Sequence, residues 1–590
     1  MGCRDIAETA QAWISATAPA DLVAPLGALV AEWREADLPA YVVWRVLSRR
    51  FGQCGLLDPA IESGRRALAS CSDNPQIMVE LARLKWQAGD DDGARALAEA
   101  VPPTHEAYAE ALLVLADLAP EPDAELAAEL AQILMARPSW VDLHDQGLGL
   151  LRRWTGNEAA AAFLIGWMKA HAPSPPTLMH LGQVLLEAGH HEQAGPILTN
   201  LWRANAAQLQ PIIGEFCDRV PPDDQTEGDL LARVEHALAQ PDDTLVRHCL
   251  PEPTKPLPER VLYVGPAMTG VSPSFPNDLA WHLGNAAALA GTTLERYDDP
   301  AITGPGRARL SDTARAERIA ALAAHVRAAR PEVMILDCCW SPLRGDLDPP
   351  TLAGLAAETD MRVLCLFRDA QSPTLSLIRH WSTAADGIIT FDPFSAIFDE
   401  GNADLAAKTL VVPVPALASP RPSDRPPSRG LTFIGGLGQV HRPILVGALL
   451  ASGIDFSAVI GDERRRLAPD LESYGRLLGD SRAALNIAVH HQDQRLITGR
   501  IWETIAAGGL LLEQGGSGIT AFFTPYRHYL PWSNIADIVQ AYRFLERHDD
   551  LRRAMIAAAR DWSARHYGPD RVWRALMAWA MRGSDDHEGP

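Results

Sequence analysis

The chain has 590 residues, of which 47% are hydrophobic and 22% are charged, and its formal net charge is −21. This composition is globular, and the length predicts about three to four domains. Such an acidic balance argues against general binding to nucleic acid or to anionic membranes. No apolar run approaches the ~20 residues of a membrane span, no signal peptide follows Met1, and the eight cysteines form no C-x-x-C pair. We therefore expect a reduced, cytoplasmic protein.

Residues 1–250 have helical composition and an internal period. Turn glycines stand at Gly55, Gly89, Gly156 and Gly189, at intervals of 34, 67 and 33 residues, and a repeat without a turn glycine, around Ala119, fills the middle interval. Large and small residues recur in register with these turns at Trp44, Leu47, Phe51, Ala60, Ala67, Leu148, Gly149, Ala161, Pro173, Leu178, Leu181, Gly182 and Ala194.

This period and register resemble those of tetratricopeptide (TPR) repeats, which stack helix pairs into an α-solenoid. The resemblance implies a concave face that binds a peptide or a protein. The alternative is that the array braces the second half of the chain. We expect the tryptophans Trp44, Trp86, Trp154 and Trp202 to lie in the core of the array.

A proline-rich linker over residues 251–258 ends the helical region, and strands and helices alternate after it. The predicted strands are Arg260–Val264, Val333–Leu336, Arg362–Phe367, Gly387–Phe391, Leu410–Val414, Leu431–Ile434, Phe456–Ile460, Ala484–Ala488 and Gly509–Leu512. Amphipathic helices are predicted at Asp278–Leu289 and Asp312–Ala329. A second proline-rich stretch, residues 418–429, divides this α/β part into two parallel sheets covered by helices, at 259–417 and 430–565, with a helical tail at 566–590.

The segment Arg500–Gly518 is the first candidate for a ligand site. A helix over Ile501–Ala507 ends at a glycine pair, a buried strand follows, and Glu513 stands at the carboxyl end of that strand. The loop after it, Gly515, Gly516, Ser517 and Gly518, lets backbone N–H groups approach a ligand. Ligands of open α/β sheets lie outside the carboxyl ends of the strands. The alternative is the helix, turn and strand of any α/β core.

A second glycine loop, Gly435, Gly436, Leu437 and Gly438, directly follows a strand and precedes a helix. This setting suits anion binding by backbone N–H groups, and His441 and Arg442 add positive charge to it. An ordinary tight turn between strand and helix is the alternative.

The stretch Arg500–Gly518 resembles the donor-sugar signature of GT-B glycosyltransferases, in particular the branch related to the spore maturation protein CgeB. The similarity continues through Ala521–Phe523 and Tyr526–Trp532 to the helices at Ile556–Trp573. It implies a GT-B fold, in which two Rossmann-like domains hold the ligand between them. It also implies that the last helix, Pro569–Met581, returns to the first of these domains.

Glu503 matches the second glutamate of the E-x7-E element of many retaining GT-B enzymes, which binds the ribose hydroxyls of the donor. A carboxylate suits a cis-diol because it accepts two hydrogen bonds. The position of the first glutamate is occupied by Arg495, and this departure favours an acidic sugar or a direct phosphate contact. Arg500 is a second cation, either a donor ligand or a salt-bridge partner of Glu503.

The first α/β domain supplies the candidate catalytic residues. Asp369 follows the strand Arg362–Phe367 in a setting that resembles the D-x-P element of the CgeB-like branch, and Asp392 follows the next strand. Such carboxylates can act as base for an acceptor hydroxyl or cap a helix. Asp278 and His282 follow the glycine- and proline-rich loop 265–277 and could approach an acceptor. No metal or other cofactor is expected, because cations and loop N–H groups can stabilise the leaving phosphate.

The order of domains resembles that of bacterial flagellin glycosyltransferases, in which TPRs dock flagellin and a GT-B domain transfers a nonulosonic acid. The resemblance implies a nucleotide-sugar donor activated by CMP and a protein acceptor, with flagellin favoured. Two alternatives stay open. One is a transferase that builds a cell-surface polysaccharide from a nucleotide-diphosphate sugar, and the other is a scaffold protein that has lost activity.

Overall fold

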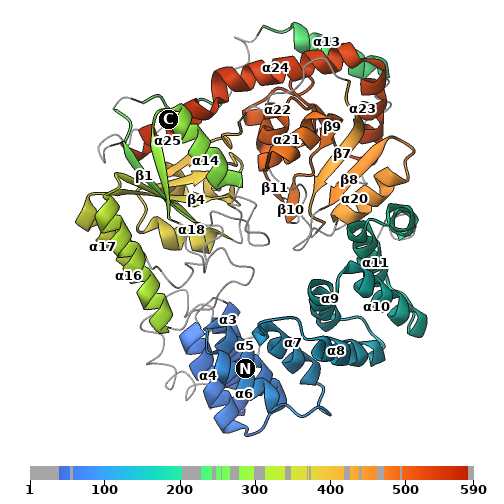
Figure 1. Ribbon diagram of the computed structural model, residues 1–590, viewed down its shortest axis with the longest axis vertical. Coiled ribbons are helices and arrows are strands. Elements are labelled where there is room, and N and C mark those ends of the chain that lie inside the picture. The colour runs from blue at the N-terminus through green and yellow to red at the C-terminus, as the bar shows by residue number, and fades with distance from the viewer. Residues whose placement is uncertain are drawn as a thin grey trace. The chain divides into compact units, whose positions relative to one another are not determined.

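The computed structural model describes residues 39–53, 57–201, 227–241, 248–253, 256–265, 278–297, 312–338, 347, 349–368, 370, 374–417, 426–437, 441–460, 471–491 and 494–582. The chain divides into two compact units, Met1–Thr177 with Arg309–Glu317 and Leu178–Ala308 with Arg318–Pro590 (Figure 1). Within the described residues, no helix combines the length and apolar composition that a bilayer span needs.

The first unit contains a row of helix pairs. Its described helices are α3(Ala40–Gln53), α4(Leu57–Ser70), α5(Pro75–Gln87), α6(Asp91–Glu99), α7(Tyr108–Leu118), α8(Ala124–Ala136), α9(Asp142–Thr155) and α10(Asn157–Ala170). The turn glycines Gly89 and Gly156 have φ angles of 83° and 92°, a region that favours glycine. Gly55 lies outside the described residues. The TPR-like helical repeat that the sequence predicts is therefore present.

Large and small side chains interlock between the helices of each pair. Trp44, Leu47, Phe51, Ala60 and Ala67 lie together in one buried cluster, as the register predicts.

The register is wrong at Gly149, where an added Cβ would meet no atom within 4 Å. The close approach falls instead at Gly147, whose Cβ would lie 2.3 Å from Cδ1 of Leu134. The sequence placed the close-packed glycine two residues too late on α9.

The next helix pair is α11(Pro175–Ala188), which belongs to the second unit from Leu178 on, and a helix over residues 191–201. Gly189 between them has a φ of 89°. A Cβ on Gly182 would lie 2.4 Å from Cδ2 of Leu198, and one on Gly447 would lie 2.6 Å from Cβ of Leu198. This pair therefore packs against α20(His441–Leu450), a helix of the α/β region.

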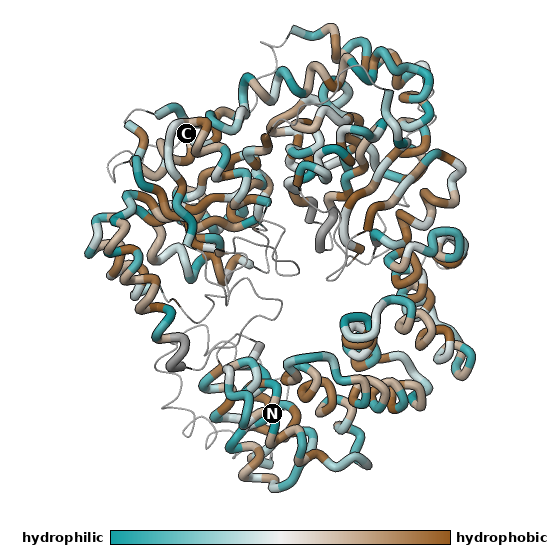
Figure 2. Tube along the Cα trace, viewed as in Figure 1, coloured by the Kyte–Doolittle hydropathy of each residue, from teal (hydrophilic) through white to brown (hydrophobic). Residues whose placement is uncertain are grey.

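The first sheet has six strands in the order β2-β1-β3-β4-β5-β6, all paired in parallel. Its strands are β1(Arg260–Val264), β2(Thr293–Tyr297), β3(Val333–Asp337), β4(Arg362–Phe367), β5(Gly387–Thr390) and β6(Thr409–Val411). Its helices are α14(Asp278–Leu289), α16(Asp312–Ala329), α17(Pro349–Thr359), α18(Leu375–Ser382) and α19(Ala403–Ala407). The central strands are largely apolar because helices cover both faces, as the hydropathy colouring shows (Figure 2).

The second sheet has five parallel strands in the order β13-β12-β9-β7-β8. They are β7(Arg429–Gly435), β8(Phe456–Ile460), β9(Ser481–Leu485), β12(Leu511–Gln514) and β13(Leu530–Trp532), and a separate antiparallel pair is formed by β10(Val489–His491) and β11(Gln494–Arg495). Helices α21(Leu471–Gly479), α22(Gly499–Ala506) and α23(Ile535–Arg547) complete this domain.

The chain ends with α24(Asp549–Tyr567) and α25(Pro569–Ala580). Val572, Trp573 and Met577 of α25 share a buried cluster with strand residues of the first sheet and with α14. A Cβ on Gly387 of β5 would lie 2.7 Å from the indole nitrogen of Trp579. The last helix thus packs on the first sheet, the role expected for it. Two parallel sheets joined in this way form a GT-B fold.

Candidate functional site

Each sheet has a switch point at its carboxyl edge. From β7 the chain runs to β8 on one side and then to β9 on the other, and β1, β2 and β3 repeat this pattern. Neighbouring connections leave the sheet in opposite directions at such a point, which opens a crevice for a ligand. Gly435 and Gly436 border the β7/β9 crevice, and Asn486 follows β9 directly.

Two arginines lie beside the β7/β9 crevice. Arg442 donates hydrogen bonds to the carbonyl oxygens of Gly436 (3.1 Å) and Ile487 (3.4 Å). Arg500 stacks on the ring of Phe433 at 5.5 Å, and a Cβ on Gly435 would lie 2.7 Å from its Nη2. Burial and the neighbouring charge of Arg500 lower the pKa of Arg442 to about 10. Neither guanidinium forms a salt bridge with a carboxylate in the described part of the chain.

Asn486 links Arg500 to Glu513. Its side-chain oxygen accepts hydrogen bonds from Nη1 of Arg500 (2.8 Å) and from the hydroxyl of Thr498 (3.1 Å), and its amide donates to Oε2 of Glu513 at 2.8 Å. Burial raises the pKa of Glu513 to about 8, although Asn486, Ser517 and the charge of Arg500 oppose this. Glu513 is therefore largely protonated at neutral pH and does not neutralise the two arginines.

The glycine loop after β12 contacts the first sheet. Gly516 has a φ of 82°, and Gly515 donates its N–H to the carbonyl of Trp532 at 2.7 Å. A Cβ on Gly518 would lie 3.0 Å from both Asp392 and Pro393, which follow β5. Ser517 and Gly518 are buried. A side chain at position 518 would therefore push the loop away from Asp392.

Asp392 is itself buried. Its Oδ1 accepts the N–H of Phe394 at 2.8 Å, and burial raises its pKa to about 6 although the N–H groups of Phe394 and Ile497 favour the carboxylate. Ile497 lies just before α22, so Asp392 ties the end of β5 to the segment that carries Arg500 and Glu503.

Glu503 pairs with a residue of the first sheet domain. Its Oε1 lies 3.3 Å from Nε2 of His282 on α14, and the two side chains are only 10% and 7% exposed. Tyr474 of α21 lies near the same carboxylate, since burial and then the charge of Glu503 raise the pKa of Tyr474. The sequence singled out both Glu503 and His282, although 221 positions separate them.

A buried polar cluster lies at the carboxyl ends of β1, β3 and β4. Arg368 bridges Asp278 (3.1 Å) and Asp337 (2.9 Å), and the Tyr263 hydroxyl donates to Asp337 at 2.6 Å. Although burial opposes its charge, these two carboxylates raise the pKa of Arg368. Asp278 also accepts the N–H of Leu279 at 2.7 Å. Its carboxylate thus holds the first turn of α14.

Three predicted site residues lie wholly or partly outside the part of the chain that the structure describes. Asp369 and Gly438 lie outside the described residues. Arg495 is described only by its backbone, which pairs with Val489 in the antiparallel β10/β11 ribbon. The roles given to Asp369, Gly438 and Arg495 stay predictions.

Sequence reasoning missed Asn486, Tyr474 and Asp337. Asn486 was the only polar residue in the apolar run 483–488, and a buried polar residue at a strand end is a signal of a site. Asp337 directly follows the predicted strand Val333–Leu336 in the same way. Tyr474 gave no such signal, because an aromatic residue on a helix is usually core.

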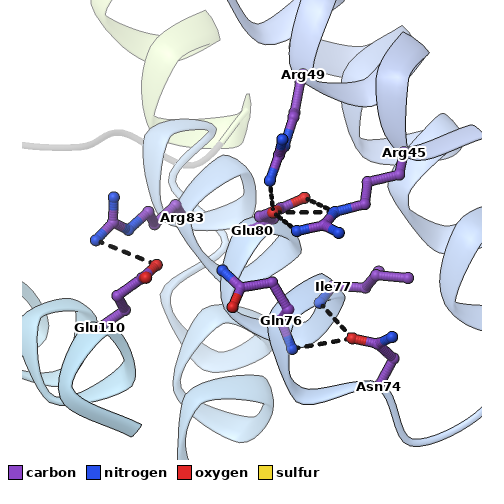
Figure 3. A network of polar contacts seen from close by, with 8 residues as sticks. All are labelled: Arg45, Arg49, Asn74, Gln76, Ile77, Glu80, Arg83 and Glu110. Carbon is purple, nitrogen blue, oxygen red and sulfur yellow. Dashed lines mark hydrogen bonds and ion pairs between the residues drawn. The ribbon is translucent and has the colours of Figure 1, made fainter. Parts of the chain in front are cut away.

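A second candidate site lies on the helical repeats. Arg83, Trp86, Gln87, Leu113, Val114, Asp117 and Gln146 line a pocket of about 190 Å³. Arg83 donates to Gln146 at 3.2 Å. Figure 3 shows Arg83 beside Glu110, at 4.0 Å, and it shows Arg45 and Arg49 converging on Glu80. Trp86 is half-buried and lines this pocket, so it does not lie wholly in the core as the sequence predicts.

Within the described residues, no group of three or more His, Cys, Asp or Glu side chains is placed to hold a metal ion.

Residues 445–578 match a protein-family model described as "Glycosyl transferase-like". The matched range contains Arg500, Glu503 and Glu513. With the two parallel sheets and the helix pairs before them, this match makes the chain a glycosyltransferase of GT-B fold preceded by TPR-like repeats.

Solved structures with detectable similarity are distant. A glycosyltransferase from Rickettsia africae is 10% identical, with a TM-score of 0.39 over 55% of this chain and 99% of that one. HepE from Anabaena, solved with UDP-glucose, is 9% identical, with a TM-score of 0.37 over 54% and 98%. A TPR protein from Thermus thermophilus is 18% identical, with a TM-score of 0.21 over 34% and 100%. No curated protein sequence matches the chain. The GT-B fold is shown by the two parallel sheets and by the packing of α25 on the first of them.

Proposed function

We propose that the chain is a cytoplasmic protein glycosyltransferase that transfers a nonulosonic acid from a CMP-activated donor to flagellin. The proposed nucleotide-sugar donor is supported by one observation, the pair of arginines at the β7/β9 crevice. The proposed protein acceptor is supported by the helical repeats that precede the GT-B fold.

An anionic donor fits the charges around the crevice. Arg442 and Arg500 lie close enough for the charge of one to lower the pKa of the other, and like charges repel unless an anion lies between them. Glu513, which is linked to Arg500 through Asn486, has a pKa of about 8 and supplies little negative charge at neutral pH. A phosphate would accept hydrogen bonds from both guanidinium groups. A nucleotide-activated sugar therefore suits this crevice.

A CMP-activated sugar acid is favoured over a neutral hexose for a reason that lies in the sequence. GT-B enzymes with the E-x7-E element have a glutamate where this chain has Arg495. An arginine there suits the carboxylate of a nonulosonic acid, and a CMP donor carries one phosphate where UDP or GDP donors carry two.

The helical repeats fit a protein acceptor. Their pocket combines an aromatic ring, Trp86, with amide and charged groups from Arg83, Gln87 and Gln146. Such a mixture can bind a polypeptide through its backbone and an apolar side chain at once. The choice of flagellin rests on the resemblance in domain order.

The test is calorimetric titration of the full-length chain with CMP, UDP and GDP, together with the variants Arg500→Met and Arg476→Met. Arg476 is an exposed arginine of α21 paired with Glu472, so it controls for loss of charge alone. CMP binding that Arg500→Met abolishes and Arg476→Met leaves unchanged supports the proposal. Preference for UDP or GDP would mean that the donor is a UDP- or GDP-activated sugar and not a CMP-activated one. A folded chain that binds none of the three nucleotides contradicts the proposal.

A further inference from the structure

The pair His282–Glu503 joins a helix of the first sheet domain to a helix of the second. Nε2 of His282 lies 3.3 Å from Oε1 of Glu503. Nδ1 of the same imidazole is buried and has no hydrogen-bond partner within the described part of the chain. Leaving a buried polar atom unsatisfied costs roughly 1–3 kcal/mol, so its presence calls for an explanation.

The carboxylate decides which nitrogen of the neutral imidazole carries the proton. A carboxylate only accepts hydrogen bonds, so Nε2 must donate to Glu503. The neutral ring then has its lone pair on Nδ1, the nitrogen without a partner. A carboxylate that fixes the tautomer through one ring nitrogen prepares the other to take a proton.

A second contact fixes the helix that carries His282. Arg368 holds Asp278 at 3.1 Å and Asp337 at 2.9 Å. Asp278 stands four residues before His282, so the two lie on the same face of α14. Asp337 is fully buried and also accepts from Tyr263. The start of α14 is thus attached to the ends of β1, β3 and β4, which limits the movement of the imidazole.

We propose that Glu503 is the positioning residue for His282, and that His282 is the general base of the transfer through Nδ1. The inference rests on the proposed function, because it needs an acceptor hydroxyl and a nucleotide sugar. It gives Glu503 a role besides the ribose contact that the resemblance implies, and it favours inversion at the anomeric carbon.

In this reaction the acceptor oxygen forms a bond to the anomeric carbon while the bond from that carbon to the donor phosphate oxygen breaks. The electron pair of the broken bond goes to the phosphate. The hydroxyl proton goes to Nδ1 of His282, and the imidazolium that forms is stabilised by Glu503 until it releases the proton to solvent.

The first test reads the tautomer without any substrate. Proton–nitrogen correlation spectra of the full chain with ¹⁵N-labelled histidine distinguish a protonated from an unprotonated Nδ1, and His282→Gln identifies the resonance. We expect an unprotonated Nδ1 in the neutral ring, and loss of this preference in Glu503→Gln but not in Glu472→Gln, an exposed control on α21. A protonated Nδ1 in the neutral ring, or the same tautomer in Glu503→Gln, overturns the positioning role.

The second test is kinetic and separates positioning from ribose binding. Glu503→Gln should lower kcat at saturating donor and acceptor by about a hundredfold or more, as for loss of general base catalysis. Its nucleotide affinity should change by less than about tenfold, because the amide still accepts a hydrogen bond. An unchanged kcat with weakened nucleotide binding would leave Glu503 as a ribose ligand only. A wild-type chain without transferase activity contradicts the proposed function. The histidine spectra would in that case still show whether Glu503 fixes the tautomer of His282.

Discussion

Arg500 donates a hydrogen bond from Nη1 to the side-chain oxygen of Asn486 at 2.8 Å. Because the Asn486 amide donates to Glu513 at 2.8 Å, one buried amide sets the positions of a cation and of a carboxyl. The β7/β9 crevice is therefore built on an interaction between the ends of β9 and β12 and the start of α22. It does not depend on the glycine loops alone.

Replacing Asn486 should affect both stability and ligand binding. In Asn486→Ala the buried Glu513 carboxyl loses its amide donor and Arg500 loses an acceptor. An unsatisfied buried partner costs about 1–3 kcal/mol, so we expect the free energy of unfolding to fall by that amount. Nucleotide affinity should fall as well because Arg500 is no longer held. Urea unfolding and calorimetric titration measure the two effects, and a variant with wild-type values in both would remove Asn486 from the site.

Glu513 should make the stability of the fold depend on pH. Its pKa lies at about 8 in the folded chain against an ordinary 4.5, so the folded state binds the proton more tightly than the unfolded state. This stabilisation is fully present below pH 4.5 and is lost as the pH rises through about 8. Glu513→Gln removes the titration but keeps the shape.

We therefore expect the stability of Glu513→Gln, relative to wild type, to rise between pH 4.5 and 8. The rise should amount to a few kcal/mol, since each pKa unit corresponds to about 1.4 kcal/mol. Urea unfolding of the two proteins at several pH values measures it. The same experiment with Glu472→Gln, whose carboxylate is exposed, should show no such trend. Parallel curves for Glu513→Gln and wild type would contradict the buried, protonated carboxyl.

Most strands of the two sheets could be predicted from the sequence, including the edge strands β6 and β8, whereas the edge strands β2 and β13 could not. The inner strands Arg260–Val264 and Arg362–Phe367 have the predicted bounds because nearly continuous apolar runs mark strands covered on both faces. The edge strand Thr293–Tyr297 has no buried residue and contains the adjacent charged residues Glu295 and Arg296. The other missed edge strand, Leu530–Trp532, is three residues long and contains a proline. Edge strands of this kind give a weak signal.

The site was predictable where one segment carries its residues and not where distant segments meet. Arg500, Glu503 and Glu513 were found because a helix, a glycine turn and a strand follow each other in one stretch. The pairing of His282 with Glu503 depends on how two domains pack, and no spacing in the sequence encodes it. The role of Asn486 likewise required the neighbouring strand, since only the sheet places Glu513 beside it.

Two glycines of α9 should respond to the same substitution in opposite ways. Gly149→Ala meets no atom within 4 Å and should stabilise the helix by about 0.5–1 kcal/mol, because alanine loses less backbone entropy. In Gly147→Ala the new methyl would lie 2.3 Å from Cδ1 of the buried Leu134. Displacing a core side chain typically costs about 1–3 kcal/mol. Thermal unfolding of the two variants should place Gly149→Ala above wild type and Gly147→Ala below it, and the reverse order would refute the packing of α8 against α9.

Salt should weaken nucleotide binding if the two arginines hold a phosphate. Charge pairs near the surface are screened over about 10 Å at 0.1 M salt. We expect the dissociation constant of the preferred nucleotide to rise between roughly 0.05 and 0.5 M NaCl, and we expect Arg442→Met to reduce this dependence because one of the two cations is gone. Titrations of wild type, Arg442→Met and Arg476→Met at several salt concentrations measure it. A salt-independent affinity in the wild type would speak against a phosphate between Arg442 and Arg500.

The pocket of the helical repeats can be tested separately from the β7/β9 crevice. Trp86 lines that pocket, and aromatic side chains at the centre of interfaces often contribute about 2 kcal/mol or more to binding. Trp86→Ala should therefore weaken the binding of purified flagellin by about thirtyfold, with nucleotide affinity unchanged. Trp154→Ala is the matched control, because Trp154 is also half-buried on the repeats but does not line the pocket. Calorimetry of both variants measures the effect, with urea unfolding to confirm that they fold. Equal losses in the two variants would mean that the pocket does not bind the acceptor, and wild-type affinity in Trp86→Ala would leave the repeats as a brace.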